Sequence, residues 1–371
     1  MPMIKVMTIF GTRPEAIKMA PVIQELKRRK EIETIVCVTA QHREMLDQVL
    51  HIFNIKPDYD LNVMQSSQTL SDITTRVLNG LESVIKECKP NIVLVHGDTS
   101  STFAGALAAY YQEVAIGHVE AGLRTWNKYS PFPEEMNRQM VGVMADYHFS
   151  PTSMSANNLI NENKNKERIY ITGNTAIDAM ATTIKKEYHH PIFDWVGKDR
   201  LLLLTAHRRE NLGEPMRHIF KAIKRILYDF DDVKVIYPIH MNPKVRSIAN
   251  EIFEGNDRVA LIEPLEVVDF HNFMNKAYLI LTDSGGVQEE APSLGKPVVV
   301  LRDTTERPEG IEAGTLILAG TKEEDIYQIT KSLLSDLNQY EKMSHACNPY
   351  GDGTASKQIV DIIVNEFKEF C

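Results

Sequence analysis

Short apolar segments alternate along the chain with longer segments in which apolar residues recur at helical spacing. In the first half the apolar segments predict strands at Lys5–Phe10, Thr34–Thr39, Ile92–His96, Ala115–Glu120 and Tyr147–Phe149. The intervening segments predict helices at Glu15–Lys30, Arg43–Phe53, Leu70–Lys86 and Thr102–Tyr111. Strands that alternate with helices in this way favour right-handed crossovers and a parallel sheet.

The alternation stops across residues 184–200, a polar stretch interrupted by Pro191 and Gly197, and then resumes. The strands expected in the second half are Leu201–Thr205, Lys234–Pro238, Val259–Ile262, Tyr278–Thr282 and Val298–Leu301. We therefore predict two doubly wound α/β domains, at residues 1–172 and 173–354, with the boundary somewhere in 165–200. Residues 355–371 predict a final helix that packs on either domain, including back on the first.

Polar residues follow the carboxyl ends of seven predicted strands. The segments are GTRPEAIK, TAQHRE, HGDTSST, HVEAGLRT, TAHRREN, YPIHMNP and LTDSGGVQEE. Ligands of open parallel sheets bind beyond these ends. We expect the seven segments to supply one binding cleft.

Composition narrows the class of protein. Of 371 residues, 43% are hydrophobic and 25% are charged, which is typical of a globular protein, and the net charge of −9 argues against binding to nucleic acid or anionic membranes. The four cysteines form no CxxC pair, so no zinc site is predicted, and no apolar run is long enough to span a membrane. The amino terminus does not read as a signal peptide, so a reduced, cytoplasmic protein is expected.

The predicted strand Tyr278–Thr282 is followed by small residues, Ser284, Gly285 and Gly286, and then by a helix and by Arg307. Backbone N–H groups at the start of a helix favour an anion, and glycine lets a phosphate approach the main chain. The alternative is that any strand-to-helix turn needs small residues. No Walker A or GxGxxG pattern follows a strand, so neither a nucleoside triphosphatase nor a nicotinamide enzyme is supported.

Cations and carboxylates follow the strands of the first half. Arg13 lies in the loop after the first predicted strand, and Lys18 lies one helical turn beyond Pro14. Taken alone, Arg13 also fits a solvated cation in a loop. Asp98 and Glu120 follow adjacent predicted strands. Clustered carboxylates can supply the acid and the base of one reaction.

Two further residues extend this set of candidates. Glu134 is the first glutamate of PFPEE and opens the helix predicted there. At this position it also fits a carboxylate that interacts with the helix dipole. His207 leaves an apolar strand and precedes two arginines, which favours a phosphate or leaving-group site over a purely structural histidine.

These segments together resemble the bacterial non-hydrolysing UDP-N-acetylglucosamine 2-epimerases. The resemblance rests on FGTRPEAIKMAP, VTAQHREMLDQVL, HGDT, HVEAGLRT, PFPEEMNR, TAHRREN, LTDSGGVQEEAPSLGKPV and RDTTERPEG, which follow one another in the family's order. It implies a GT-B architecture, in which two Rossmann-like domains face each other across a deep cleft. It also implies a homodimer that interconverts UDP-GlcNAc and UDP-ManNAc, through elimination of UDP and a 2-acetamidoglucal intermediate, with neither a metal nor another cofactor.

The resemblance further implies the role of each site residue. The catalytic residues would be Asp98, Glu120, Glu134 and His207. The residues that bind the UDP-sugar would be Arg13, Lys18, Phe270, Ser284, Gly285, Gly286, Glu290 and Arg307. A second, allosteric site for UDP-GlcNAc would be formed by Gln41, His42, Gln68, Arg208 and His240.

Three other functions remain open on the sequence alone. A hydrolysing 2-epimerase would release free ManNAc, a GT-B glycosyltransferase would pass the sugar to an acceptor, and a non-catalytic sensor would only bind the nucleotide-sugar. The sensor has no use for Asp98, Glu120 and Glu134. Which of these carboxylates is acid and which is base stays open as well.

Overall fold

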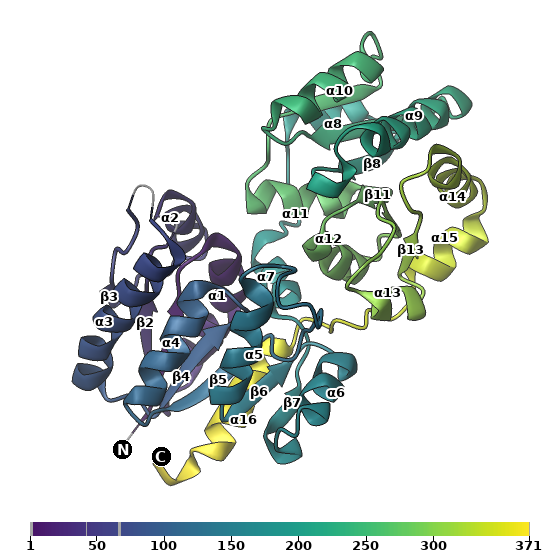
Figure 1. Cartoon of the computed structure of the whole chain (residues 1–371). Coiled ribbons are helices and arrows are strands. Elements are labelled where there is room, and N and C mark those ends of the chain that lie inside the picture. The colour runs from purple at the N-terminus through teal and green to yellow at the C-terminus, as the bar shows by residue number, and fades with distance from the viewer. Residues whose placement is uncertain (1–2, 42, 66–67, 371) are drawn as a thin grey trace. The chain divides into compact units, whose positions relative to one another are not determined.

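The computed structural model describes residues 3–41, 43–65 and 68–370, and it divides into two compact units. Unit 1 comprises Met1–Thr182 and Tyr350–Cys371, and unit 2 comprises Thr183–Pro349. The last helix, α16 (Ala355–Glu366), thus belongs to unit 1 (Figure 1). There it packs against α1 (Arg13–Arg28). None of the helices in the described part of the chain is both long and apolar enough to cross a membrane.

Unit 1 contains a seven-stranded sheet with the order β3-β2-β1-β4-β5-β6-β7. All neighbouring strands are parallel. The strands are β1 (Ile4–Phe10), β2 (Ile32–Val38), β3 (Tyr59–Asp60), β4 (Ile92–His96), β5 (Ala115–Val119), β6 (Tyr147–Ser150) and β7 (Ile169–Ile171). Besides α1 and α16, the helices are α2 (Arg43–Ile52), α3 (Leu70–Cys88), α4 (Ser100–Tyr111), α5 (Glu134–Met144), α6 (Ser153–Asn161) and α7 (Thr175–Thr183), the last of which crosses into unit 2 at its final residue.

Unit 2 contains a six-stranded parallel sheet with the order β10-β9-β8-β11-β12-β13. Its strands are β8 (Arg200–Thr205), β9 (Val233–Pro238), β10 (Val259–Ile262), β11 (Leu279–Thr282), β12 (Val298–Val300) and β13 (Leu316–Leu318). The helices are α8 (Pro191–Val196), α9 (Glu214–Asp229), α10 (Pro243–Phe253), α11 (Val267–Lys276), α12 (Gly285–Glu290), α13 (Pro308–Glu312), α14 (Glu323–Ser335) and α15 (Leu337–Ser344).

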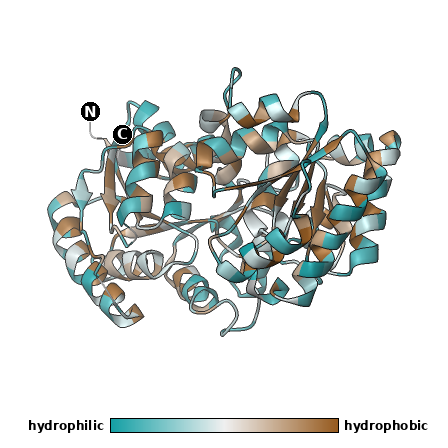
Figure 2. Cartoon of the chain, turned by 90° about the horizontal axis from the view of Figure 1, so that it is seen from above, coloured by the Kyte–Doolittle hydropathy of each residue, from teal (hydrophilic) through white to brown (hydrophobic). Residues whose placement is uncertain are grey.

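Both faces of the sheet in unit 1 are buried. Along β1, Ile4 and Val6 belong to the core under α1, α2 and α16, whereas Met7 and Ile9 belong to the core under α3 and α4. Figure 2 shows the same arrangement as brown strands between helices that carry both brown and teal residues. Burial on both faces explains why the strands read as nearly continuous apolar runs.

The α/β class and the two doubly wound parallel sheets predicted from the sequence are confirmed. In each unit the first strand lies between the second and the fourth, so the chain reverses its direction of winding between β1 and β4 and between β8 and β11. Crevices for ligands form at such switch points. The segments that follow these four strands contain Arg13, Asp98, His207 and Ser284.

Candidate functional site

The turn after β1 in unit 1 depends on a glycine. A Cβ atom on Gly11 would lie 1.8 Å from Thr39 Oγ1, which is a severe clash, so only glycine fits between this turn and the end of β2. Arg13, the first residue of α1, follows at once and is partly exposed. The backbone is therefore closely packed two residues before Arg13.

Glu15 ties the turn after β1 to the turn after β4. Its buried carboxylate accepts hydrogen bonds from the backbone N–H of Gly11 (3.1 Å) and Thr12 (2.8 Å) through Oε2. Its other oxygen accepts the hydroxyls of Thr99 (2.7 Å) and Thr102 (2.8 Å). Burial raises the pKa of Glu15, and hydrogen bonds from Thr99, Thr12, Thr102 and Gly11 oppose that rise.

Glu120 follows β5 in a strained backbone conformation. Its φ of +64° lies in the left-handed region, which costs free energy for a residue other than glycine. The Lys18 ammonium contacts its Oε1, and Asn174 Nδ2 lies 3.4 Å from the same oxygen. The ring of His96, at the end of β4, places Nε2 3.7 Å from Oε2. A defined set of polar groups therefore surrounds one of the predicted catalytic carboxylates.

Asp98 is held by α5, the helix that Glu134 opens. The guanidinium of Arg138 contacts the Asp98 carboxylate, and Asn137 Nδ2 donates to the Asp98 carbonyl oxygen at 2.9 Å. One carboxylate oxygen of Glu134, Oε2, is buried and has no hydrogen-bond partner in the part of the chain that the structure describes. The first two turns of α5 therefore contain both Glu134 and the two side chains that contact Asp98.

Glu135 organises the loop before α5. Its fully buried carboxylate accepts the backbone N–H of Thr125 (3.0 Å) and Trp126 (3.2 Å) and the side-chain amide of Gln139 (2.8 Å). Arg138 Nη1 lies 3.3 Å from Glu135 Oε2. Of the two glutamates in PFPEE, the second is therefore structural in its contacts.

In unit 2, Asp283 joins the turns after β8 and β11. Its Oδ2 accepts the backbone N–H of His207 (2.8 Å) and Arg208 (2.8 Å) and the side-chain amide of Asn211 (3.0 Å). The His207 ring stacks on His240 with 5.4 Å between centroids and 7° between planes. Burial lowers the pKa of His207, Asp283 opposes this, and His240 and Arg208 lower it further.

The helix after β11 begins earlier than predicted, because α12 starts at Gly285 and the sequence placed the helix after Gly286. A Cβ atom on Gly285 would lie 3.1 Å from the Arg307 guanidinium carbon, so the missing side chain allows Arg307 to pack on the start of the helix. Arg307 Nε and Nη2 each lie 2.8 Å from Oε1 of Glu289.

The second acidic residue of α12 has different surroundings. Glu290 Oε2 lies 3.6 Å from Nε2 of the buried His271. His271 Nδ1 forms a 2.7 Å hydrogen bond with the Thr183 hydroxyl. The neighbouring Phe270, on α11, is partly buried. Glu289 and Glu290 therefore point to different partners, although the sequence presents them as one acidic pair.

The residues predicted to form the allosteric site are divided between the units. In unit 1, Gln41 Oε1 accepts the Ser101 hydroxyl at 2.9 Å, and Gln68 Oε1 accepts from Arg76 Nη1 at 3.3 Å. Arg208 and His240 lie in unit 2 around His207. His42 lies outside the described residues.

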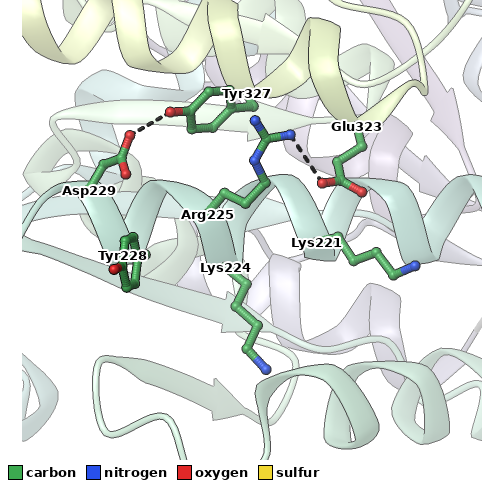
Figure 3. Close-up of a pocket in the computed structure, with 7 residues that line it drawn as sticks. All are labelled: Lys221, Lys224, Arg225, Tyr228, Asp229, Glu323 and Tyr327. Atoms are coloured by element: carbon green, nitrogen blue, oxygen red, sulfur yellow. Dashed lines mark hydrogen bonds and ion pairs between the residues drawn. The ribbon is translucent and has the colours of Figure 1, made fainter.

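One pocket of unit 2 lies away from the predicted site. Its volume is about 360 Å³, and its lining, drawn in Figure 3, comes from α9 and α14. The Arg225 guanidinium lies 3.8 Å from the centre of the Tyr327 ring, and Arg225 Nη1 lies 3.1 Å from Glu323 Oε1. The Tyr327 hydroxyl donates to Asp229. These mutual contacts are typical of a packing interaction between two helices.

The sequence is similar to those of known proteins. A family model described as UDP-N-acetylglucosamine 2-epimerase matches residues 24–364. The chain belongs to the UDP-N-acetylglucosamine 2-epimerase family. It is 65% identical to the UDP-N-acetylglucosamine 2-epimerase of Bacillus subtilis (strain 168) over 358 residues, which cover 96% of this chain and 94% of the relative.

Solved structures of the family show the same fold. A crystal structure of a UDP-N-acetylglucosamine 2-epimerase is 62% identical and has a TM-score of 0.93, covering 100% of this chain and 97% of the other. The UDP-GlcNAc 2-epimerase from Neisseria meningitidis, solved bound to UDP-GlcNAc, is 48% identical and has a TM-score of 0.86, covering 98% of this chain and 100% of that one. The fold is therefore GT-B-like, and the family predicted from the motifs is confirmed.

Proposed function

We propose that the protein is a non-hydrolysing, metal-independent epimerase that acts in the cytoplasm and interconverts UDP-GlcNAc and UDP-ManNAc. A base removes the C2 proton, the C–H electron pair forms the C1–C2 double bond, and the C1–O bond breaks with its electrons going to UDP. UDP then adds back to C1 of the 2-acetamidoglucal while a proton reaches the opposite face of C2. The ManNAc unit supplies a cell-surface polysaccharide.

The observation that carries the proposal is that the two carboxylates after neighbouring strands of unit 1 are each held by a cation. Arg138 contacts Asp98, and Lys18 contacts Glu120. Acid–base chemistry at C2 needs carboxylates in fixed positions, because proton transfer requires hydrogen-bond reach. In this proposal Asp98, Glu120 and Glu134 supply the acid and the base.

In the same proposal unit 2 binds UDP. The start of α12, at Ser284, Gly285 and Gly286, accommodates phosphate, Glu290 binds the ribose hydroxyls, and Phe270 lies near the uracil. His207 and Arg307, together with Arg13 and Lys18 of unit 1, stabilise the charge of the departing diphosphate. Support comes from Arg307, which pairs with Glu289 on α12, and from the relative of Neisseria meningitidis that was solved bound to UDP-GlcNAc.

The reaction is tested by incubating the protein with UDP-GlcNAc in D2O and following both sugar nucleotides by NMR and mass spectrometry. The expected result is deuterium at C2 of UDP-GlcNAc and of UDP-ManNAc, without net loss of UDP-sugar. An unlabelled pool contradicts the elimination. Accumulation of free ManNAc and UDP instead establishes the hydrolysing reaction, and turnover only in the presence of an acceptor establishes a glycosyltransferase.

The roles of the carboxylates are tested with Asp98→Asn and Glu134→Gln, which keep shape and remove charge. We expect exchange at C2 to fall by at least about 100-fold in each variant, since general acid–base catalysis contributes factors of this order. UDP affinity, measured by calorimetry, should stay within roughly threefold of wild type because these residues act on the sugar. A large loss of UDP affinity would assign them to binding.

We also propose that UDP-GlcNAc activates the enzyme at a second site formed by Gln41, His42, Gln68, Arg208 and His240. Replacing Gln41 by Ala should make a sigmoidal dependence of rate on UDP-GlcNAc hyperbolic, and unchanged sigmoidicity would contradict the site.

Finally, we propose that the protein is a homodimer. Tyr110, Tyr111 and Val143 on the neighbouring helices α4 and α5 are 59%, 60% and 72% exposed, and a second copy would cover them. Light scattering that returns the monomer mass at micromolar protein concentration would contradict this.

A further inference from the structure

The Asp283 carboxylate is fully buried at the switch point of unit 2, and its two oxygens have different surroundings. Oδ2 accepts three N–H groups, from the backbone of His207 and Arg208 and from the side chain of Asn211. Oδ1 is buried and has no hydrogen-bond partner within the described residues. A buried carboxylate oxygen without a partner is costly, so its position calls for an explanation.

A candidate partner of this oxygen is the His207 ring, whose Nδ1 lies 3.6 Å from Oδ1. This distance is longer than a hydrogen bond, and a shift of less than about 1 Å brings the two atoms to the usual 2.7–3.2 Å. The ring plane is already restricted, because His207 stacks parallel to His240. The backbone before the ring is restricted as well, since the Tyr237 hydroxyl donates to the carbonyl of Ala206.

The charged and titratable groups that act on the His207 ring are Asp283, His240 and Arg208. Asp283 is the anion among them, and a carboxylate oxygen can only accept a hydrogen bond. A neutral histidine that donates through Nδ1 carries its lone pair on Nε2. The outer nitrogen of His207 is then free to accept a proton or a hydrogen bond from a bound ligand.

We propose that Asp283 is a positioning residue that holds His207 in the Nδ1–H tautomer and aims Nε2 at the departing diphosphate of the UDP-sugar. The proposal rests on the role of His207 given above. Before the elimination, His207 Nε2 takes up one proton from a hydronium ion, which becomes water, and the resulting imidazolium faces the diphosphate. Asp283 stabilises that cation through the Nδ1–H without becoming protonated. This is the division of labour known for carboxylate–histidine pairs in general.

Asp283→Asn separates the two functions of the carboxylate. The amide oxygen can occupy the position of Oδ2 and accept the same three N–H donors, which preserves the turn. The amide NH2 group then occupies the position of Oδ1 and faces His207 Nδ1 as a donor. Because two donors cannot pair, His207 must adopt the opposite tautomer, with the proton on Nε2.

The experiment is ¹⁵N NMR of the full-length protein with labelled histidine, in which the His207 signals are assigned by their loss in His207→Gln. We expect a protonated Nδ1 and an unprotonated Nε2 in the wild type, and the reverse in Asp283→Asn. We also expect kcat to fall about 10- to 100-fold in Asp283→Asn with KM for UDP-GlcNAc little changed, a loss typical of residues that orient a catalytic group.

Two results would overturn the proposal. One is a wild-type His207 that carries its proton on Nε2, and this can be measured even if Asp283→Asn does not fold. The other is a folded Asp283→Asn protein with wild-type kcat. Asp229→Asn is the matched control, since Asp229 accepts from Tyr327 and Lys331 on the surface of α9 and α14. It should change neither the tautomer nor kcat.

The tautomer measurement needs no turnover. A failure of the proposed reaction, seen as an absence of C2 labelling in wild-type protein, is therefore distinguishable from a failure of the role of Asp283.

Discussion

Arg138, in the second turn of α5, contacts the carboxylate of Asp98, which follows β4. The same guanidinium lies 3.3 Å from Oε2 of Glu135, a residue with no exposed surface. One cation thereby links a predicted catalytic carboxylate to the carboxylate that organises the loop before α5. This link makes Arg138 a residue whose loss should affect both chemistry and stability.

Replacing Arg138 by Met should reduce C2 exchange by roughly 100-fold, because Asp98 loses the partner that positions it. The free energy of unfolding should fall by about 3–5 kcal/mol, since Glu135 is left as a buried charge with one cation fewer. Arg138→Lys should recover part of both. Exchange is measured in D2O below the unfolding midpoint of each variant.

Arg217→Met is the control for Arg138. Arg217 forms a surface ion pair with Glu251, and its loss should leave the exchange rate unchanged. Wild-type exchange in a folded Arg138→Met protein would show that Asp98 needs no cation.

Glu15 should be essential to unit 1 although it carries no proposed chemistry. Glu15→Ala leaves two backbone N–H groups buried without their acceptor, so we expect a loss of about 2–5 kcal/mol in the free energy of unfolding. Glu15→Gln should cost less, because its amide oxygen can accept both N–H groups while its NH2 group donates to the hydroxyls of Thr99 and Thr102. Urea unfolding measures the difference, and equal stability of the Ala and Gln variants would contradict the argument.

The sequence predicted the sheets well because both faces of each are buried and the strands are nearly continuous apolar runs. Short edge strands such as β3 and β13 were not predicted, since segments of two and three residues carry no periodicity. The polar residues at the strand ends were predicted correctly to lie between a strand and the next helix, as after β1, β4 and β11. Their distant partners were not found, because Arg138 lies 40 residues from Asp98, Glu15 lies 84 residues from Thr99 and Asp283 lies 76 residues from His207.

Gly285 and Gly286 also have different surroundings that the sequence does not reveal. The sequence presents them as equivalent, but a Cβ atom would lie 3.1 Å from the Arg307 guanidinium at the first position and 3.8 Å from Glu290 Oε1 at the second. Gly285→Ala should therefore displace Arg307 from the start of α12 and weaken UDP binding by roughly tenfold. Calorimetry with UDP measures this effect. If Gly285→Ala binds UDP as wild type does, then Arg307 does not act at this turn.

Three buried histidines in unit 1 should make the fold sensitive to acid. Burial lowers the pKa of His96 to about 4, of His118 to about 3 and of His148 to about 4, from an unfolded value of 6.5. For His118 the hydrogen bond to the Gly97 carbonyl opposes the effect of burial, and for His148 Lys164 and Arg124 add to it. All three rings are neutral in the folded protein near neutral pH.

Because these folded pKa values lie below the unfolded value, unfolding takes up protons, and the stabilisation present above pH 6.5 is lost as pH falls toward 4. At pH 5 each ring costs about 2 kcal/mol relative to pH 7, which is large against a total stability of about 5–15 kcal/mol. Urea unfolding at pH 7.5, 6 and 5 measures this loss. His148→Phe should reduce the pH dependence by about one proton, whereas His189→Gln, at a largely exposed position, should leave it unchanged. Equal stability at pH 7.5 and pH 5 would mean that the three rings are already protonated in the native state or accessible to water.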